Sequence, residues 1–349
     1  MSDQKLIIGM PAGSLANPNR GGNLIELLKH AGFPTKGYAK GGPTSFPVNN
    51  VLIGWDGRPQ EFGAQLAIGE IDVAIAGDDW IQERVLEFKY EYDQEIILEK
   101  VLSLNRGGVR LVIINNPIED DSTFDEWLRQ LLVEKPLISM VSEMPYLALD
   151  WFHKKIATLG FEESHSAYSV QKFKTPPKND SGLVIYETWG KTEAKVLNGS
   201  VDFGLEITQT GSAIRNYGLQ MSEEVCHSET GIWANPKLKD DPEKLELARM
   251  FLLNLSGSIF AEDKLLLCFN VRHEDAEDVV AYLRDNALFG DEPTLNRGEN
   301  YTELSVQVST KNKNTGLAQV RYELAKMGAS HIETIPLDSC ITGLDAIDF

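Results

Sequence analysis

The sequence is poor in cysteine and in basic residues, and each shortage argues against certain kinds of site or partner. Its 349 residues include only three cysteines, Cys226, Cys268 and Cys340, and no Cys-x-x-Cys pair. This number and spacing predict neither a disulfide framework nor a zinc site, and favour buried thiols in a reducing compartment. Lysine and arginine total 33 against 52 aspartate and glutamate residues, which gives a net charge of -19. Such a surface repels nucleic-acid phosphates, so we expect no nucleic-acid partner.

Long apolar runs and histidine metal motifs are missing as well. No segment approaches the length of a membrane span, and the apolar stretch near the N-terminus is too short for a secretory signal. We therefore expect a cytoplasmic protein with no membrane partner. The six histidines show neither His-x-x-x-His nor His-Glu-x-x-His spacing. A metal ion held by protein side chains alone is therefore not expected.

What the sequence does contain is a regular alternation of apolar runs and amphipathic segments. Strands are predicted over 6–10, 51–54, 72–76, 96–104, 109–114, 137–142 and 201–207, and helices over 24–31, 58–68, 79–88, 123–133, 147–159, 212–217 and 242–255. This alternation predicts an α/β fold with a parallel sheet and helices on both of its faces. Residues 160–182 are polar and contain prolines, which indicates a hairpin excursion or a mobile flap.

The C-terminal part of the chain has a pattern of its own. A strand over 265–271, a helix over 274–284, strands over 293–298 and 304–309, a helix over 315–327 and a strand over 331–336 follow one another. This β-α-β-β-α-β order is the ferredoxin-like arrangement. We therefore predict an appended α+β domain at this end of the chain.

The segment with the strongest chemical pattern leaves a predicted strand and enters a predicted helix. It consists of Glu206, Ile207, Thr208, Gln209, Thr210, Gly211, Ser212 and Ala213. Free backbone N–H groups at the start of a helix bind anions, and glycine lets the backbone approach the anion closely. Glu206, at the strand end, is placed to accept hydrogen bonds from ribose hydroxyls. The alternative is an ordinary capping turn, because Ser and Thr are preferred at helix starts in any case.

Residues Glu206–Leu219 resemble the phosphoribosyl-pyrophosphate (PRPP) loop of ATP phosphoribosyltransferase, the first enzyme of histidine biosynthesis. Three further segments, Gly57–Glu61, Asp72–Trp80 and Val141–Pro145, resemble motifs of the same family in the same order. The C-terminal pattern looks like the regulatory domain of the long-form enzymes. The resemblance implies a two-lobed core like the type II periplasmic-binding proteins, with lobe I over 1–105 and 223–262, lobe II over 106–222, and a ferredoxin-like regulatory domain over 263–349.

The resemblance also implies an activity, the Mg²⁺-dependent transfer of phosphoribosyl from PRPP to N1 of ATP with release of pyrophosphate. It assigns PRPP binding to Glu206, Thr208, Gln209, Thr210, Gly211, Ser212 and Ala213, and nucleotide or pyrophosphate binding to Gly13, Ser14, Arg58, Gly77, Asp78, Asp79 and Glu143. No side chain is assigned as a chemical catalyst, because the reaction needs positioning and charge stabilisation above all. The magnesium ion would be carried by the pyrophosphate. An effector, histidine or AMP, and a homo-oligomer, a hexamer or dimer, are further implications.

The chain departs from the family where that family carries phosphate-binding side chains. After the first strand it has Ala12-Gly13-Ser14-Leu15 instead of a basic segment, the helix after Pro145 lacks its paired basic residues, and Ala213 replaces a threonine. Each charge-assisted contact that is lost would have contributed roughly 1.5–3 kcal/mol. The basic residues that would have to compensate are Arg20, Lys36, Lys40 and Arg215. Two alternatives therefore stay open: a paralogue with a different acceptor or phosphorylated ligand, and a non-catalytic cytoplasmic ligand sensor.

Overall fold

The apolar runs of the sequence form the strands of two separate sheets in the computed structural model. The structure describes residues 4–12, 22–40, 43–47, 51–118, 122–286, 288, 292–311 and 316–349. Within them, one sheet has the strand order β2-β1-β3-β9-β4-β8-β5-β7-β6 and the other has the order β11-β12-β10-β13. The chain divides into two units, one formed by residues 1–24 and 36–247 and the other by residues 25–35 and 248–349.

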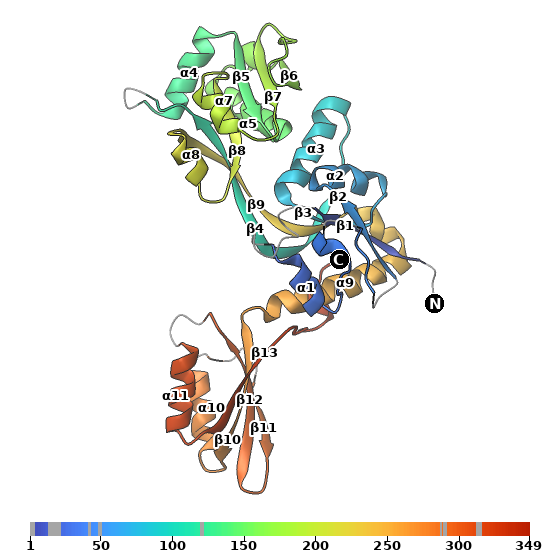
Figure 1. Ribbon diagram of the computed structural model, residues 1–349, viewed down its shortest axis with the longest axis vertical. Coiled ribbons are helices and arrows are strands. Elements are labelled where there is room, and N and C mark those ends of the chain that lie inside the picture. Colours follow the sequence, from blue (N-terminus) through green and yellow to red (C-terminus); the bar gives the residue numbers. More distant parts are fainter. Residues whose placement is uncertain are drawn as a thin grey trace. The chain divides into compact units, whose positions relative to one another are not determined.

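The larger sheet belongs to the first unit. Its strands are β1 Leu6–Pro11, β2 Leu52–Gly57, β3 Val73–Gly77, β4 Glu99–Asn115, β5 Leu137–Ser142, β6 Tyr168–Lys172, β7 Gly182–Glu187, β8 Phe203–Thr208 and β9 Gln220–Ala234. β1 pairs in parallel with β2 and β3, and β5, β6, β7 and β8 form a second parallel set. The long strands β4 and β9 run antiparallel to each other and join these two sets (Figure 1). We call the β1–β3 part lobe I and the β5–β8 part lobe II.

Helices of the first unit follow the apolar periodicity and end at capping residues. They are α2 Pro59–Ile68, α3 Asp78–Tyr92, α4 Phe124–Glu134, α5 Pro145–Leu159, α6 Glu162–His165, α7 Thr192–Leu197 and α8 Ser212–Asn216, with short 3₁₀ turns at Tyr38–Lys40 and Pro236–Asp240. A capping box formed by Thr123 and Glu126 starts α4. Gly160 ends α5 with a φ of 81°. Phe152 of α5 and Phe203 of β8 are fully buried in lobe II, and each contributes roughly 1.5–3 kcal/mol through this burial.

Three sequence-based expectations about this sheet are wrong. The sheet is mixed, because β4 and β9 are antiparallel to their neighbours. The two strands expected over 96–104 and 109–114 are one continuous strand, since Asn105 (φ 52°) and Gly107 (φ 69°) accommodate bulges that keep the pairing with β9. Residues 160–182 contain α6 and the edge strand β6, which pairs with β7 in parallel and forms no hairpin. β7, α7 and β9 were not predicted.

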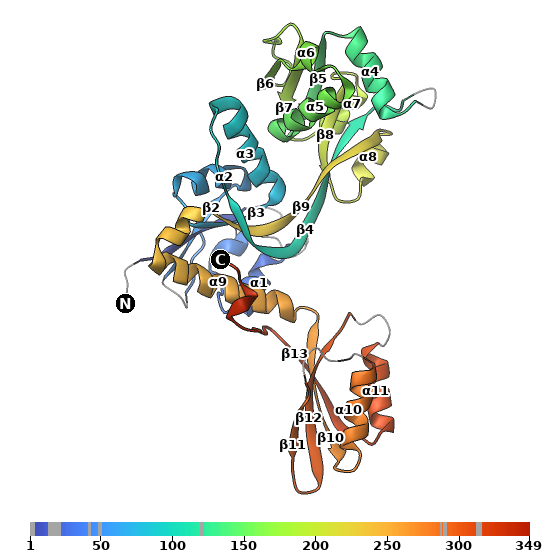
Figure 2. The same cartoon turned by 180° about the vertical axis from the view of Figure 1, so that it is seen from behind.

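The smaller sheet belongs to the second unit. Its elements are β10 Lys264–Arg272, α10 Ala276–Asp285, β11 Thr294–Arg297, β12 Tyr301–Ser309, α11 Leu317–Lys326 and β13 Ser330–Pro336, followed by a 3₁₀ turn at Leu344–Ala346. Both helices lie on the same face of this sheet (Figures 1 and 2). Leu267, Phe269 and Val271 alternate along β10 toward that face and are buried. The predicted fold class, a two-lobed α/β core with a ferredoxin-like domain, is confirmed.

Two further helices involve the second unit. α1 spans Leu24–His30, and α9 spans Pro242–Ala261 and continues from the first unit into the second. Within the second unit, the Phe33 and Phe251 rings lie 5.2 Å apart between centroids. No helix among the described residues is long and apolar enough to cross a membrane. The finer boundaries expected for the two lobes stay a prediction.

Candidate functional site

A cavity of about 440 Å³ lies where lobe I faces lobe II. Ala12 follows β1, Arg58 follows β2 and Gly77 ends β3, so three neighbouring parallel strands deliver their carboxyl ends to this wall. Ligands of open α/β sheets bind outside such strand ends. Lobe II contributes Trp189, from the loop after β7, and Ile207 near the end of β8. The cavity is therefore bounded by both lobes at the edge where this class of fold binds ligands.

The lobe I wall offers a cation and a tightly built turn. The Arg58 side chain is exposed and makes no ion pair within the described part of the chain. Gly77 stands at the N-cap of α3, where an added Cβ would lie 2.2 Å from Oδ1 of Asp79. A larger residue at this turn would therefore require the Asp79 carboxylate to move. Asp79 is buried, which raises its pKa, and its Oδ1 accepts a hydrogen bond of 2.9 Å from the Trp80 amide.

Asp78, predicted to act with Gly77 and Asp79, is engaged elsewhere. Its carboxylate lies 2.9 Å from Nζ of Lys100 and accepts a bond of 3.3 Å from the Glu229 amide. Lys100 also pairs with the Glu229 carboxylate at 2.9 Å. Arg58, Gly77 and Asp79 line the cavity, whereas Asp78 belongs to this neighbouring ion-pair network.

Residues 206–213, called the 206–213 loop, run from the last residues of β8 through a tight turn into the first residues of α8. Gly211 has a φ of 71°, and its amide donates a bond of 2.8 Å to Oγ1 of Thr208. The Ser212 amide donates to Oγ1 of Thr210 at 3.3 Å, and that hydroxyl lies 2.8 Å from Oγ of Ser212. Nη2 of Arg215 donates to the Thr210 carbonyl at 2.8 Å. The loop thus combines hydroxyls, amides and a cation, and hydroxyls within the loop accept hydrogen bonds from the Gly211 and Ser212 amides.

Glu206 precedes Ile207 on β8, and only Ile207 of the two lines the cavity. Burial raises the pKa of Glu206 to about 7, and the nearby carboxylates of Glu193 and Glu143 act in the same direction. Glu143 is itself half-buried, which raises its pKa, and it accepts a hydrogen bond from the Gly190 amide. These carboxyl groups suit ribose hydroxyls or a cation carried by a ligand.

The remaining expected site residues divide into two groups. Gln209 and Ala213 are exposed in the 206–213 loop. Gly13, Ser14 and Arg20 lie outside the described residues. No group of three or more His, Cys, Asp or Glu side chains within the described ranges is arranged to hold a metal ion. Trp189 was not predicted as a site residue. The only sequence feature that could have indicated it is a tryptophan next to a glycine.

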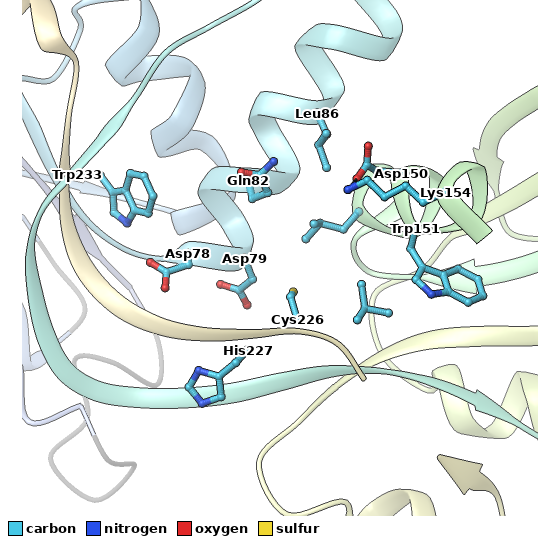
Figure 3. Close-up of a pocket in the computed structure, with 12 residues that line it drawn as sticks. Asp78, Asp79, Gln82, Leu86, Asp150, Trp151, Lys154, Cys226, His227 and Trp233 are labelled. Carbon is cyan, nitrogen blue, oxygen red and sulfur yellow. Dashed lines mark ion pairs between the residues drawn. The ribbon is translucent and has the colours of Figure 1, made fainter. Parts of the chain in front are cut away.

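A second cavity of about 360 Å³ lies between α3 and α5 over strand β9 (Figure 3). Asp79 and Gln82 face it from α3, and Asp150 and Lys154, which form an ion pair of 2.6 Å, face it from α5. Burial raises the pKa of Cys226, on its floor, to about 11, so this thiol stays protonated at neutral pH. With three aspartates among its lining residues, this cavity suits a polyphosphate less well than the cavity beside Arg58.

A buried glutamate joins the two lobes beside this second cavity. Glu83 of α3 accepts hydrogen bonds from the amides of Tyr146 (2.9 Å) and Leu147 (2.7 Å), in the first turn of α5. Burial raises the pKa of Glu83 to about 8, while the two amides act in the opposite direction. The carboxyl oxygens of Glu83 supply acceptors that the start of a helix lacks. Glu83 therefore caps a helix of the other lobe.

We expect Glu83→Ala to lower the free energy of unfolding by about 2–5 kcal/mol, because two buried amides would lose their acceptors. Glu83→Gln keeps one acceptor and should restore part of this loss. Urea unfolding at pH 7 measures both, with Glu163→Ala, an exposed glutamate of α6, as the control. An alanine variant as stable as the wild type would contradict the capping role.

The sequence of this chain is similar to a known family and to several known proteins. Residues 58–255 match the family model of ATP phosphoribosyltransferase. An ATP phosphoribosyltransferase of Desulfatibacillum aliphaticivorans is 28% identical over 87% of this chain and 88% of its own length. ATP phosphoribosyltransferase 1 of Geobacter sulfurreducens is 27% identical over 96% of this chain and 99% of its own.

Solved structures show more distant likenesses. An ATP phosphoribosyl transferase (HisG:HisZ) complex from Thermotoga maritima aligns with a TM-score of 0.48 and 15% identity, over 72% of this chain and 98% of that one. An arginine-bound ArgBP from T. maritima aligns with a TM-score of 0.34 and 13% identity, over 72% of this chain and 94% of that one.

Proposed function

The chain belongs to the ATP phosphoribosyltransferase family, and we propose that it transfers phosphoribosyl from PRPP to N1 of ATP, as the committed step of histidine biosynthesis. The observation that carries this proposal is the 206–213 loop, whose Ile207 lines the cavity that Arg58 and Gly77 also line. A phosphorylated ribose held by the loop would lie next to a cation on the opposite lobe. The two substrates could thus meet inside one cavity.

Each group has a role in this mechanism. Glu206 accepts hydrogen bonds from the ribose hydroxyls, and the amides and hydroxyls of the loop hold the 5-phosphate. The lone pair of N1 forms the new bond to C1 of the ribose, and the electrons of the C1–O bond leave with pyrophosphate. Arg58 stabilises the negative charge that develops on this leaving group. The two lobes supply orientation, which accounts for much of the rate gain in reactions between two substrates.

We assign no metal ion to protein ligands alone. The donor set near the loop consists of Glu206, Glu143 and Glu193, and burial raises the pKa of Glu206 and Glu143. This set fits a hydrated Mg²⁺ that arrives with the pyrophosphate, since Mg²⁺ keeps several waters and binds one or two carboxylates. The ion would offset the pyrophosphate charge.

The second unit is proposed to carry regulation. Its ferredoxin-like sheet would bind an effector, which would be histidine or AMP. Assembly into a homo-oligomer, a hexamer or a dimer, would couple this unit to the cavity. Both features rest on the family and on the β-α-β-β-α-β order of this unit.

A second candidate is transfer to a less anionic acceptor than ATP. The observation that favours it lies on α5, where the family resemblance led us to expect paired basic residues. Asp150 stands there, and it accepts a hydrogen bond of 3.0 Å from the Tyr90 hydroxyl. This carboxylate lines the second cavity and pairs with Lys154, so this part of α5, which the structure describes in full, offers no unpaired cation for an acceptor's phosphates.

Product analysis by mass spectrometry tests both candidates. The full-length chain is mixed with PRPP, Mg²⁺ and one of ATP, ADP, AMP or adenosine. N1-phosphoribosyl-ATP and pyrophosphate are the expected products with ATP. Turnover with AMP or adenosine alone would select the second candidate, and no product from any acceptor would reject the transferase function.

A further inference from the structure

We propose that the Trp189 indole stacks on the planar purine ring of the acceptor nucleotide and sets the preference of the cavity for a heteroaromatic base. The inference rests on the proposed function and deepens it. Trp189 lines the cavity of about 440 Å³, yet 63% of its surface is exposed. Large aromatic side chains that stay exposed on a concave wall mark contact surfaces for ligands.

The loop that carries Trp189 is fixed on both sides of this residue. Nζ of Lys195 donates to Oγ1 of Thr188 at 2.6 Å and to the Gly190 carbonyl at 2.8 Å. Oγ1 of Thr188 donates to the same carbonyl at 3.1 Å, and the Gly190 amide donates to the Glu143 carboxylate. Trp189 is thus exposed on an anchored turn, with its neighbours held in place. A side chain supported in this way is preorganised for binding, which lowers the entropy cost of ordering it.

The rest of the cavity wall identifies the chemistry of the ligand. Trp80 lines the cavity from lobe I, and its amide is fixed by Oδ1 of Asp79 at 2.9 Å. The Arg58 guanidinium lines the same cavity. Flat apolar surfaces together with a guanidinium match a molecule that has a planar ring at one end and phosphates at the other. A nucleotide has this composition, whereas PRPP and pyrophosphate lack the ring.

Calorimetric titration of the full-length chain with two probes separates a contact to the base from a contact to the phosphates. ATP carries the ring, and inorganic tripolyphosphate carries the charges without it. For Trp189→Leu we expect ATP affinity to fall about 10- to 100-fold, as for the loss of one base-stacking contact. Tripolyphosphate affinity should stay within about 2-fold, because phosphates do not stack. Trp189→Phe, which keeps a ring, should retain most of the ATP affinity.

Matched variants guard against a general loss of structure. Trp55→Leu removes another exposed tryptophan, on β2, that does not line the cavity, and should bind ATP like the wild type. Wild-type ATP affinity in Trp189→Leu would overturn the inference alone. An equal loss for ATP and tripolyphosphate would also overturn it, since this result indicates a collapsed site. A wild-type protein that binds no ATP would overturn the inference and the proposed function together.

Discussion

Replacing Gly211 with valine is expected to weaken PRPP binding at least about 100-fold, because the loop can no longer close around a phosphate. Gly211 has a φ of 71°, a conformation that costs a residue with a side chain about 1–3 kcal/mol. An added Cβ would also lie 2.7 Å from Sδ of Met221 and 3.0 Å from Nη1 of Arg215. The collision would displace the guanidinium that fixes the Thr210 carbonyl. The substitution would therefore change both the backbone conformation of the loop and the position of its positive charge.

Gly199→Val provides the matched control. Gly199 has a similar φ of 64°, but an added Cβ would meet no atom within 4 Å. Both variants therefore carry the same backbone strain, and only the Gly211 variant disturbs the loop. Calorimetric titration with PRPP and Mg²⁺ should give wild-type affinity, within about 3-fold, for Gly199→Val. Equal losses in the two variants would show that the 206–213 loop does not hold the phosphate.

Local patterns in the sequence determined much of the fold. The apolar run Leu137–Ser142 was predicted to the residue, because it is bounded by a proline before and a glutamate–proline segment after. The predicted helix over 123–133 lies within one residue of α4, whose start Thr123 and Glu126 fix by a capping box without help from the rest of the chain. The loop at Gly211 was recognisable for the same reason, since its hydroxyl and amide contacts span only a few residues.

Features that depend on distant partners could not be predicted in this way. β9 has no apolar alternation, and its place in the sheet depends on distant partners: it pairs with β4 along its whole length and with β3 only over residues 230–234. Glu83 has the sequence context of a solvent-facing helix residue, yet its hydrogen-bond partner Tyr146 is 63 positions away. Asp78 and Asp79 are adjacent in sequence, and their different roles depend on Lys100 and Ser228, which other strands supply.

Glu206→Gln is expected to weaken PRPP binding about 10- to 100-fold at pH 8, the effect of losing one hydrogen bond to a charged acceptor. Burial raises the pKa of Glu206 to about 7. The ionised carboxylate accepts hydrogen bonds from ribose hydroxyls and binds a magnesium ion more strongly than the neutral acid does, so binding releases a proton wherever the free protein is protonated. The wild-type dissociation constant should therefore rise about 10-fold per unit as pH falls below 7, and should level off above it.

The Glu206→Gln variant also separates the titration of Glu206 from the titration of PRPP itself. The 5-phosphate of PRPP gains a proton near pH 6, which weakens binding to any variant. The dissociation constant of Glu206→Gln divided by that of the wild type cancels this contribution. This ratio should shrink toward 1 between pH 8 and pH 6, because wild-type Glu206 becomes as neutral as glutamine. Glu163→Gln, at an exposed position of α6, should follow the wild type throughout. A ratio that stays constant over this range would show that Glu206 does not need its charge to bind PRPP, and would remove it from the ribose site.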